Sequence, residues 1–95
     1  MPTLEEIKEG ASEILQQGGV KRAAVFGSFA RGETTHKSDL DLLIEFEGEK
    51  TLLDLVALKN RLERAIHLKV DLITYRSISP LLRENILREQ IPLYG

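Results

Sequence analysis

The sequence predicts an α/β (α+β) fold, with helices packed on a small mixed sheet of three or so strands. Three segments have the short apolar patterns of strands, and three others repeat apolar residues at helical spacing. The two kinds of segment alternate along the chain, which is typical of helices layered on a sheet. The 95 residues suggest a single domain over residues 1–95.

The first helix is expected to begin after Thr3, which forms a capping box with Glu6. Two glycines at 18–19 end this helix, and residues 20–26 read as the first strand. Gly27 and Ser28 then turn the chain. The apolar residues that repeat at helical spacing in the first helix are Leu4, Ile7, Ala11, Ile14 and Leu15.

The second strand is expected over 39–46, where apolar residues alternate with polar ones. A helix follows from Thr51 to about residue 67, and residues 69–75 form the third strand. Pro80 fits the first position of a last helix. The segment "IPLYG" reads as a short tail with a proline breaker.

Composition excludes several functions. The net charge of −2 gives no global attraction to nucleic acid or to an anionic membrane. No apolar run approaches the ~18 residues of a membrane span, and the acidic N-terminus lacks a signal-peptide core. The absence of cysteine excludes disulfides and thiolate metal sites. We expect a cytoplasmic protein that binds neither membrane nor nucleic acid directly.

Three aspartates lie in segments that read as buried strands, although aspartate is a poor strand former. Asp39 and Asp41 share one face of the second strand, about 6.6 Å apart, and Asp71 joins them if the third strand lies alongside. Two unit charges 4 Å apart repel by about 4 kcal/mol at an effective dielectric of 20, and Mg²⁺ would remove that cost. The alternatives are a solvated face for Asp39 and Asp41, and pairing of Asp71 with Lys69 or Arg76.

The turn at Gly27 and Ser28 offers a second kind of ligand group. Glycine lets a ligand approach the main chain closely, and Ser28 supplies a hydroxyl and an N–H that suit a phosphate. Either feature alone is typical of an ordinary turn. Ten residues separate this turn from Asp39, and the combination of a phosphate-binding turn with a carboxylate metal site indicates nucleotide chemistry.

The stretches "VFGSFARGE" and "SDLDLLIEF" resemble the nucleotidyltransferase fold of the DNA polymerase β superfamily. More closely, they are similar to the minimal nucleotidyltransferase (MNT) family, typified by the MntA antitoxins. That family's signature is Gly-Ser, a ten-residue gap, Asp-x-Asp and an aspartate on a later strand. The resemblance covers essentially the whole chain, since the order of helices and strands also agrees.

The resemblance implies catalytic and metal-binding roles for the three aspartates. Asp39 and Asp41 would bind two Mg²⁺ ions, and Asp71 would complete the metal site and help activate an acceptor hydroxyl. The implied reaction transfers AMP from ATP to that hydroxyl and releases pyrophosphate, by two-metal catalysis.

The resemblance also implies a nucleotide-binding role for the turn. Gly27 and Ser28 would hold the triphosphate, and Arg31 would lie near it. A surface arginine that ends a turn is the alternative for Arg31. His36, in the following loop, is either a catalytic base or a solvated loop histidine.

The expected partner is a protein. By resemblance, MNT proteins pair with HEPN-family RNase toxins and act as antitoxins by adding AMP to a toxin tyrosine. The chain ends about twenty residues after the third strand, so the acceptor would be supplied in trans or the chain would oligomerise. Seven apolar residues either form an interface or close the core: Leu52, Leu53, Val56, Leu81, Leu82, Leu93 and Tyr94.

Two other functions remain open from the sequence. The enzyme could transfer AMP to a small hydroxyl compound such as an aminoglycoside, although we expect no second domain that could hold one. Alternatively, the protein could be a non-catalytic antitoxin or binding module that neutralises its partner by contact. The complete set of aspartates disfavours that second alternative.

Overall fold

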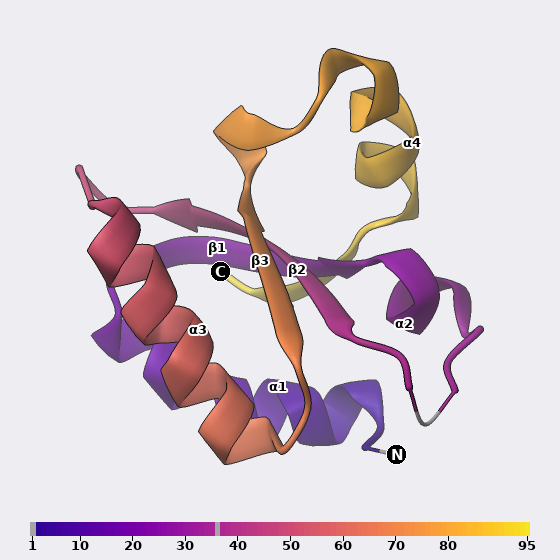
Figure 1. The fold of residues 1–95 in the computed structure, drawn as a ribbon, viewed down its shortest axis with the longest axis horizontal. Coiled ribbons are helices and arrows are strands. Elements are labelled where there is room, and N and C mark those ends of the chain that lie inside the picture. The colour runs from indigo at the N-terminus through magenta and orange to yellow at the C-terminus, as the bar shows by residue number, and fades with distance from the viewer. Residues whose placement is uncertain (1, 36) are drawn as a thin grey trace.

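The computed structural model describes residues 2–35 and 37–95. Figure 1 shows the order of the elements along the chain. The helices are α1 (Leu4–Gln17), α2 (Gly27–Arg31), α3 (Leu52–Ile66), the 3₁₀ turn η1 (Tyr75–Ser77) and α4 (Pro80–Glu89). The strands are β1 (Val20–Phe26), β2 (Leu40–Phe46), β3 (Val70–Thr74) and β4 (Ile91–Tyr94). Among these described helices, none is both long and apolar enough to span a membrane.

The strands form one mixed sheet in the order β3-β2-β1-β4. β1 runs antiparallel to both of its neighbours, while β2 and β3 are parallel and are joined through α3. The predicted mixed sheet is confirmed, with one strand added. The tail expected at 91–95 is wrong in part, because residues 91–94 pair with β1 as an edge strand.

The main core lies between the sheet and the pair of helices α1 and α3, which cover one face together (Figure 1). The alternation predicted for β2 is confirmed: Leu40, Leu42 and Ile44 are completely buried in this core. Leu15 of α1 and Leu62 of α3 are buried against them. This face therefore anchors β2 firmly and leaves its odd-numbered residues on the other face.

Both long helices begin with the residues that their sequences predict. Thr3 Oγ1 accepts the N–H of Glu6 at 3.1 Å, and the Glu6 carboxylate accepts the N–H of Thr3 at 3.1 Å. Thr51 and Asp54 form the same reciprocal pair at the start of α3. These capping boxes satisfy main-chain donors that a helix start leaves without partners.

The opposite face of the sheet carries a smaller apolar cluster made of Phe26, Leu43, Tyr75 and Ile78. α4 lies over this cluster, on the side of the sheet away from α1 and α3 (Figure 1). It buries no residue completely and touches the cluster through Ile86 and Leu87. This face is therefore only partly covered, and the starts of β2 and β3 remain accessible.

The apolar residues considered for an interface divide into two groups. Leu93 of β4 is 4% exposed and belongs to the main core, so it is not available to a partner. Tyr94 is half-buried against the same core. The other five are exposed: Leu52, Leu53, Val56, Leu81 and Leu82.

Candidate active site

Two of the three aspartates occupy equivalent positions on neighbouring strands. Asp41 is the second residue of β2, Asp71 is the second residue of β3, and the parallel register places them directly opposite each other. Asp39 comes just before β2. Residues paired in this way point to the same face of a sheet, and here that face is the one that carries Leu43 rather than the main core. The predicted neighbourhood of β2 and β3 is confirmed.

The charge on Asp41 is unfavourable in this setting. The pKa of Asp41 is raised from 3.8 to about 6, first by burial and then by the negative charges of Asp71, Asp39 and Glu89, while the charge of Arg31 acts in the opposite direction. The carboxylates are therefore close enough to repel one another. Such a group of hard oxygen donors attracts cations.

Gly27 places the turn directly against Asp41. Its φ of 70° lies in the left-handed region, and a Cβ built at this position would collide with Asp41 Oδ2. Any other residue here would be strained and would also displace the carboxylate. Ser28 follows Gly27 at the start of α2 and is half-buried. The structure thus brings the turn and the aspartates together, as the sequence predicts.

The positive charge of Arg31 acts on Asp41 and lowers its pKa, against the effect of the carboxylates. Its Nε donates to Glu33 at 2.8 Å, and its Nη1 donates to Glu89 at 3.2 and 3.3 Å. Gly27 N–H also donates to Glu89, at 3.0 Å. Arg31 is thus an exposed arginine at the end of α2 whose ion pair with Glu89 lies beside the turn.

Glu89 is the site residue that sequence reasoning misses. It is 62 residues from Gly27, lies at the end of α4, and belongs to no motif in the sequence. Only the pairing of β4 with β1 brings it to the turn, because Ile91 lies opposite Val25. The sequence signal for that pairing is hidden by a proline at position 92.

The donor set suits magnesium, but the carboxylates are not gathered into a binding cluster. Within residues 2–35 and 37–95, no three His, Cys, Asp or Glu side chains converge closely enough to hold a metal ion as they stand. Carboxylate oxygens are the ligands Mg²⁺ takes in proteins, often together with substrate phosphates. The chemistry therefore fits Mg²⁺ held jointly with a nucleotide. His36 lies outside the described residues.

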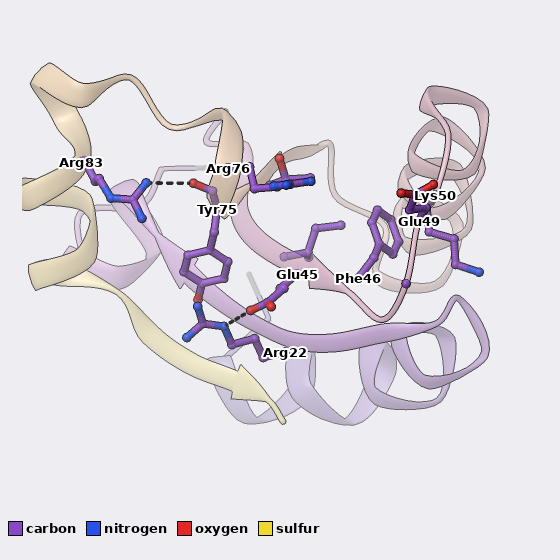
Figure 2. A pocket seen from close by; sticks show the side chains of 11 residues that line it. Arg22, Glu45, Phe46, Glu49, Lys50, Tyr75, Arg76 and Arg83 are labelled. Carbon is purple, nitrogen blue, oxygen red and sulfur yellow. Dashed lines mark hydrogen bonds and ion pairs between the residues drawn. The ribbon is translucent and has the colours of Figure 1, made fainter.

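A hollow of about 770 Å³ lies beside the ends of β2 and β3, and none of the predicted site residues lines it. Figure 2 shows Arg22, Tyr75 and Arg83 lining it. The Arg22 guanidinium lies 4.1 Å from the centre of the Tyr75 ring, and its Nε donates to Glu45 at 2.7 Å. Arg83 donates to the Tyr75 carbonyl at 3.2 Å. The contacts of both arginines are thus made within the protein, to Glu45 and Tyr75.

The site has carboxylates at the starts of two parallel strands, beside a turn that requires glycine. This arrangement suits the transfer of nucleotidyl groups. The class of protein is a nucleotidyltransferase. The family follows from the sequence: the model of the family "Polymerase beta, Nucleotidyltransferase" matches residues 8–95. The chain belongs to that family.

Two relatives from archaea match nearly the whole chain. A candidate protein adenylyltransferase of Methanocaldococcus jannaschii is 50% identical over 88 residues, which cover 93% of this chain and 95% of that protein. The protein adenylyltransferase MntA of Thermococcus cleftensis is 37% identical over 95 residues, 96% of each chain. The similarity is to small proteins of this chain's own length.

Three solved structures are similar in fold to this chain. A structure described as that of a candidate minimal nucleotidyltransferase has a TM-score of 0.83 and 44% identity, with 97% of each chain covered. A toxin–antitoxin crystal structure with AMP-PNP has a TM-score of 0.80 at 22% identity, covering 93% of this chain and 73% of that one. An MNT antitoxin in complex with a tri-AMPylated HEPN toxin of Shewanella oneidensis has a TM-score of 0.75 at 19% identity, covering 98% and 73%. Because the last two structures have low sequence identity to this chain, their similarity shows a shared fold and nothing further.

Proposed function

We propose that this nucleotidyltransferase transfers AMP from ATP to a hydroxyl group of a partner protein, with Mg²⁺, and acts as the antitoxin of a HEPN-type toxin. The observation that carries the proposal is the register of β2 and β3, which sets Asp41 beside Asp71 next to the Gly27 turn. The relatives named as protein adenylyltransferases support a protein acceptor. Toxin–antitoxin complexes of the same fold support a toxin as the partner.

In this proposal the three aspartates hold the metal. Asp39, Asp41 and Asp71 would bind two Mg²⁺ ions together with the triphosphate. When bound, magnesium neutralises charge on the phosphates and makes the acceptor hydroxyl more acidic. The raised pKa of Asp41, caused first by burial and then by Asp71 and Asp39, fits a site whose negative charge is balanced only when cations are present.

The remaining site residues position the nucleotide. Gly27 and Ser28 offer main-chain N–H groups and a hydroxyl to the triphosphate, and Arg31 offers a guanidinium that suits phosphate oxygens. A bond forms between the acceptor oxygen and the α-phosphorus, and the bond from that phosphorus to the bridging oxygen breaks. Pyrophosphate leaves, and the acceptor proton passes toward Asp71. Positioning and electrostatic stabilisation carry most of such a transfer.

A tyrosine of the toxin is the acceptor that the proposal favours. The phenolic hydroxyl of a tyrosine can enter a site that is open on one side, and the face that carries the aspartates is only partly covered by α4. The 770 Å³ hollow is lined by none of the aspartates, so it would not hold a small acceptor against them.

The test uses ATP labelled on the α-phosphate, Mg²⁺ and the protein encoded next to this one. We expect label on the partner's tyrosine with the wild-type chain and none with Asp39→Asn/Asp41→Asn, while circular dichroism reports the same fold for both. Glu49→Gln, a change of an exposed carboxylate far from the site, serves as the matched control and should transfer like the wild type. Label transfer by the double variant would refute the assignment.

The same variant separates catalysis from contact. If Asp39→Asn/Asp41→Asn still neutralises the toxin in cells without transferring label, the protein acts by binding alone. If neutralisation is lost together with transfer, the antitoxin activity depends on the chemistry.

A further inference from the structure

Glu89 brings a negative charge into a site that already holds three. Its Oε1 accepts the N–H of Gly27 at 3.0 Å, and its carboxylate accepts Arg31 Nη1 at 3.2 and 3.3 Å. It is also one of the charges that raise the pKa of Asp41. A fourth carboxylate here adds repulsion, so its place is explained by the two donors that it occupies.

Those donors are ones that a phosphate would use. A main-chain N–H and a guanidinium bind carboxylate and phosphate oxygens in the same way, through short charge-assisted hydrogen bonds. In the proposed reaction, Gly27 and Arg31 serve the triphosphate. In the structure, the Glu89 carboxylate accepts hydrogen bonds from both of these donors.

We propose that Glu89 is an internal competitor for the nucleotide: its carboxylate holds the Gly27 N–H and the Arg31 guanidinium, and the triphosphate must displace it to bind. This inference rests on the proposed function, because it assigns those two groups to the nucleotide's phosphates. Its consequence is that the affinity for ATP is set partly by α4, an element that contributes none of the aspartates.

The connection between α4 and β4 aims Glu89 at the turn. Only Gln90 separates Glu89 from β4, and Ile91 lies opposite Val25, two residues before Gly27. Leu93, which is 4% exposed, fixes β4 in the main core. The backbone at the end of α4 is thus held beside the turn.

The contact is weak enough to be displaced. The side chains of Arg31 and Glu89 are 47% and 28% exposed, and ion pairs that solvent reaches contribute little to stability. α4 buries no residue completely, so it resists a small shift less than α1 or α3 would. A triphosphate with its metal ions can therefore replace Glu89 at small cost.

The first test compares nucleotide affinity in the wild type, Glu89→Ala and Glu89→Gln by titration calorimetry. ATP with Mg²⁺ and inorganic tripolyphosphate are the two probes, used separately. We expect both variants to bind both probes about three- to tenfold more tightly. Glu84→Gln is the matched control, because Glu84 is on the same helix and its pair with Arg88 is exposed to solvent; it should bind like the wild type.

The outcomes separate the two proposals. If the wild type binds ATP and both Glu89 variants bind it equally or more weakly, the competitor role is overturned and the proposed function stands. If neither the wild type nor any variant binds ATP, the proposed function is overturned, and the competitor role with it.

Hydrogen exchange gives a readout that affinity alone does not. Saturating ATP should speed the exchange of backbone amides in residues 80–89 of the wild type, because losing the Glu89 contact loosens α4. In Glu89→Ala these amides should exchange quickly already, and ATP should change them little. Slower or unchanged exchange in the ATP-bound wild type would contradict displacement.

Discussion

The contact between Gly27 and Asp41 is the tightest constraint in the site. The glycine is buried, its φ is 70°, and a Cβ there would overlap Asp41 Oδ2. The motif that identifies the site in the sequence is thus explained by two physical needs at one position: a left-handed backbone and empty space beside a carboxylate.

Gly27→Ala should destabilise the fold and weaken ATP binding at least tenfold. The side chain adds the strain of a left-handed residue, about 1–2 kcal/mol, and it also pushes Asp41 aside. Gly48→Ala is the matched control, because Gly48 has a φ of 73° and open space around it. Urea unfolding should show a smaller loss for Gly48→Ala, and calorimetry should show unchanged ATP affinity. Equal effects of the two variants would refute the contact's role.

Asp41→Asn should stabilise the protein at pH 7. Because the pKa of Asp41 is raised from 3.8 to about 6 by burial and by Asp71 and Asp39, the folded state binds more protons than the unfolded state between those values. The free energy of unfolding therefore falls as the pH rises from about 4 to about 6. Removing the charge should raise the free energy of unfolding by about 1–2 kcal/mol at pH 7, after allowance for solvent screening.

Urea unfolding at several pH values between 4 and 7 measures this effect. The Asp41→Asn curve should be flatter than that of the wild type over this window. Asp54→Asn provides a contrast of opposite sign, because hydrogen bonds from Thr51 lower the pKa of Asp54. Loss of the Asp54 carboxylate should therefore destabilise the protein at pH 7. A wild-type pH dependence in Asp41→Asn would show that Asp41 ionises without cost.

At the scale of elements, the sequence predicts most of the fold because its signals are local. The capping boxes at Thr3 and Thr51, the alternation over 40–46 and the proline at the start of α4 each depend on residues within a few positions of one another. These signals give α1, β2, α3 and the start of α4 their types and bounds to within a residue or two. They also place the three aspartates, since two lie on one strand start and the third is fixed by a parallel neighbour.

The elements that the sequence does not reveal depend on distant partners. β4 is short and contains Pro92, which reads as a breaker, but proline is tolerated on an edge strand, and β4 pairs only with β1. Glu89 becomes a site residue because of that pairing. Both features depend on tertiary contacts, which leave no periodic pattern in the sequence of the segment.

Leu93→Ala should test how much β4 contributes to stability. Leu93 is 4% exposed in the main core, and truncating a buried leucine costs about 2–5 kcal/mol. Leu81→Ala, a change of the same size at a residue that is 91% exposed, should change the free energy of unfolding by less than about 0.5 kcal/mol. Urea unfolding of both variants measures the difference. Similar losses would mean that β4 does not close the core.

At the scale of the whole molecule, the uneven exposure of leucines suggests where a partner binds. Leu52 and Leu53 at the start of α3 are 73% and 80% exposed, and Val56 one turn later is 45% exposed. Apolar residues gathered on one part of a surface mark binding sites more often than single exposed ones do. The start of α3 is therefore the region that we expect to contact the partner or a second copy of the chain.

Leu53→Glu should weaken capture of the partner at least tenfold and leave ATP affinity unchanged, because a charge would have to be buried in an apolar contact. Leu81→Glu, at a leucine of α4 that is 91% exposed, is the control and should bind the partner normally. Pull-down with the purified partner and light scattering of the isolated chain measure the two kinds of association. Loss of binding in Leu81→Glu alone would move the interface to α4.

The parallel pairing of β2 with β3 has a consequence for engineering. Two acids that are 30 positions apart in the chain meet only because their strands are aligned on the same rung. Slipping β3 by a single residue should therefore abolish the proposed transfer, because it would turn Asp71 toward the opposite side of the sheet.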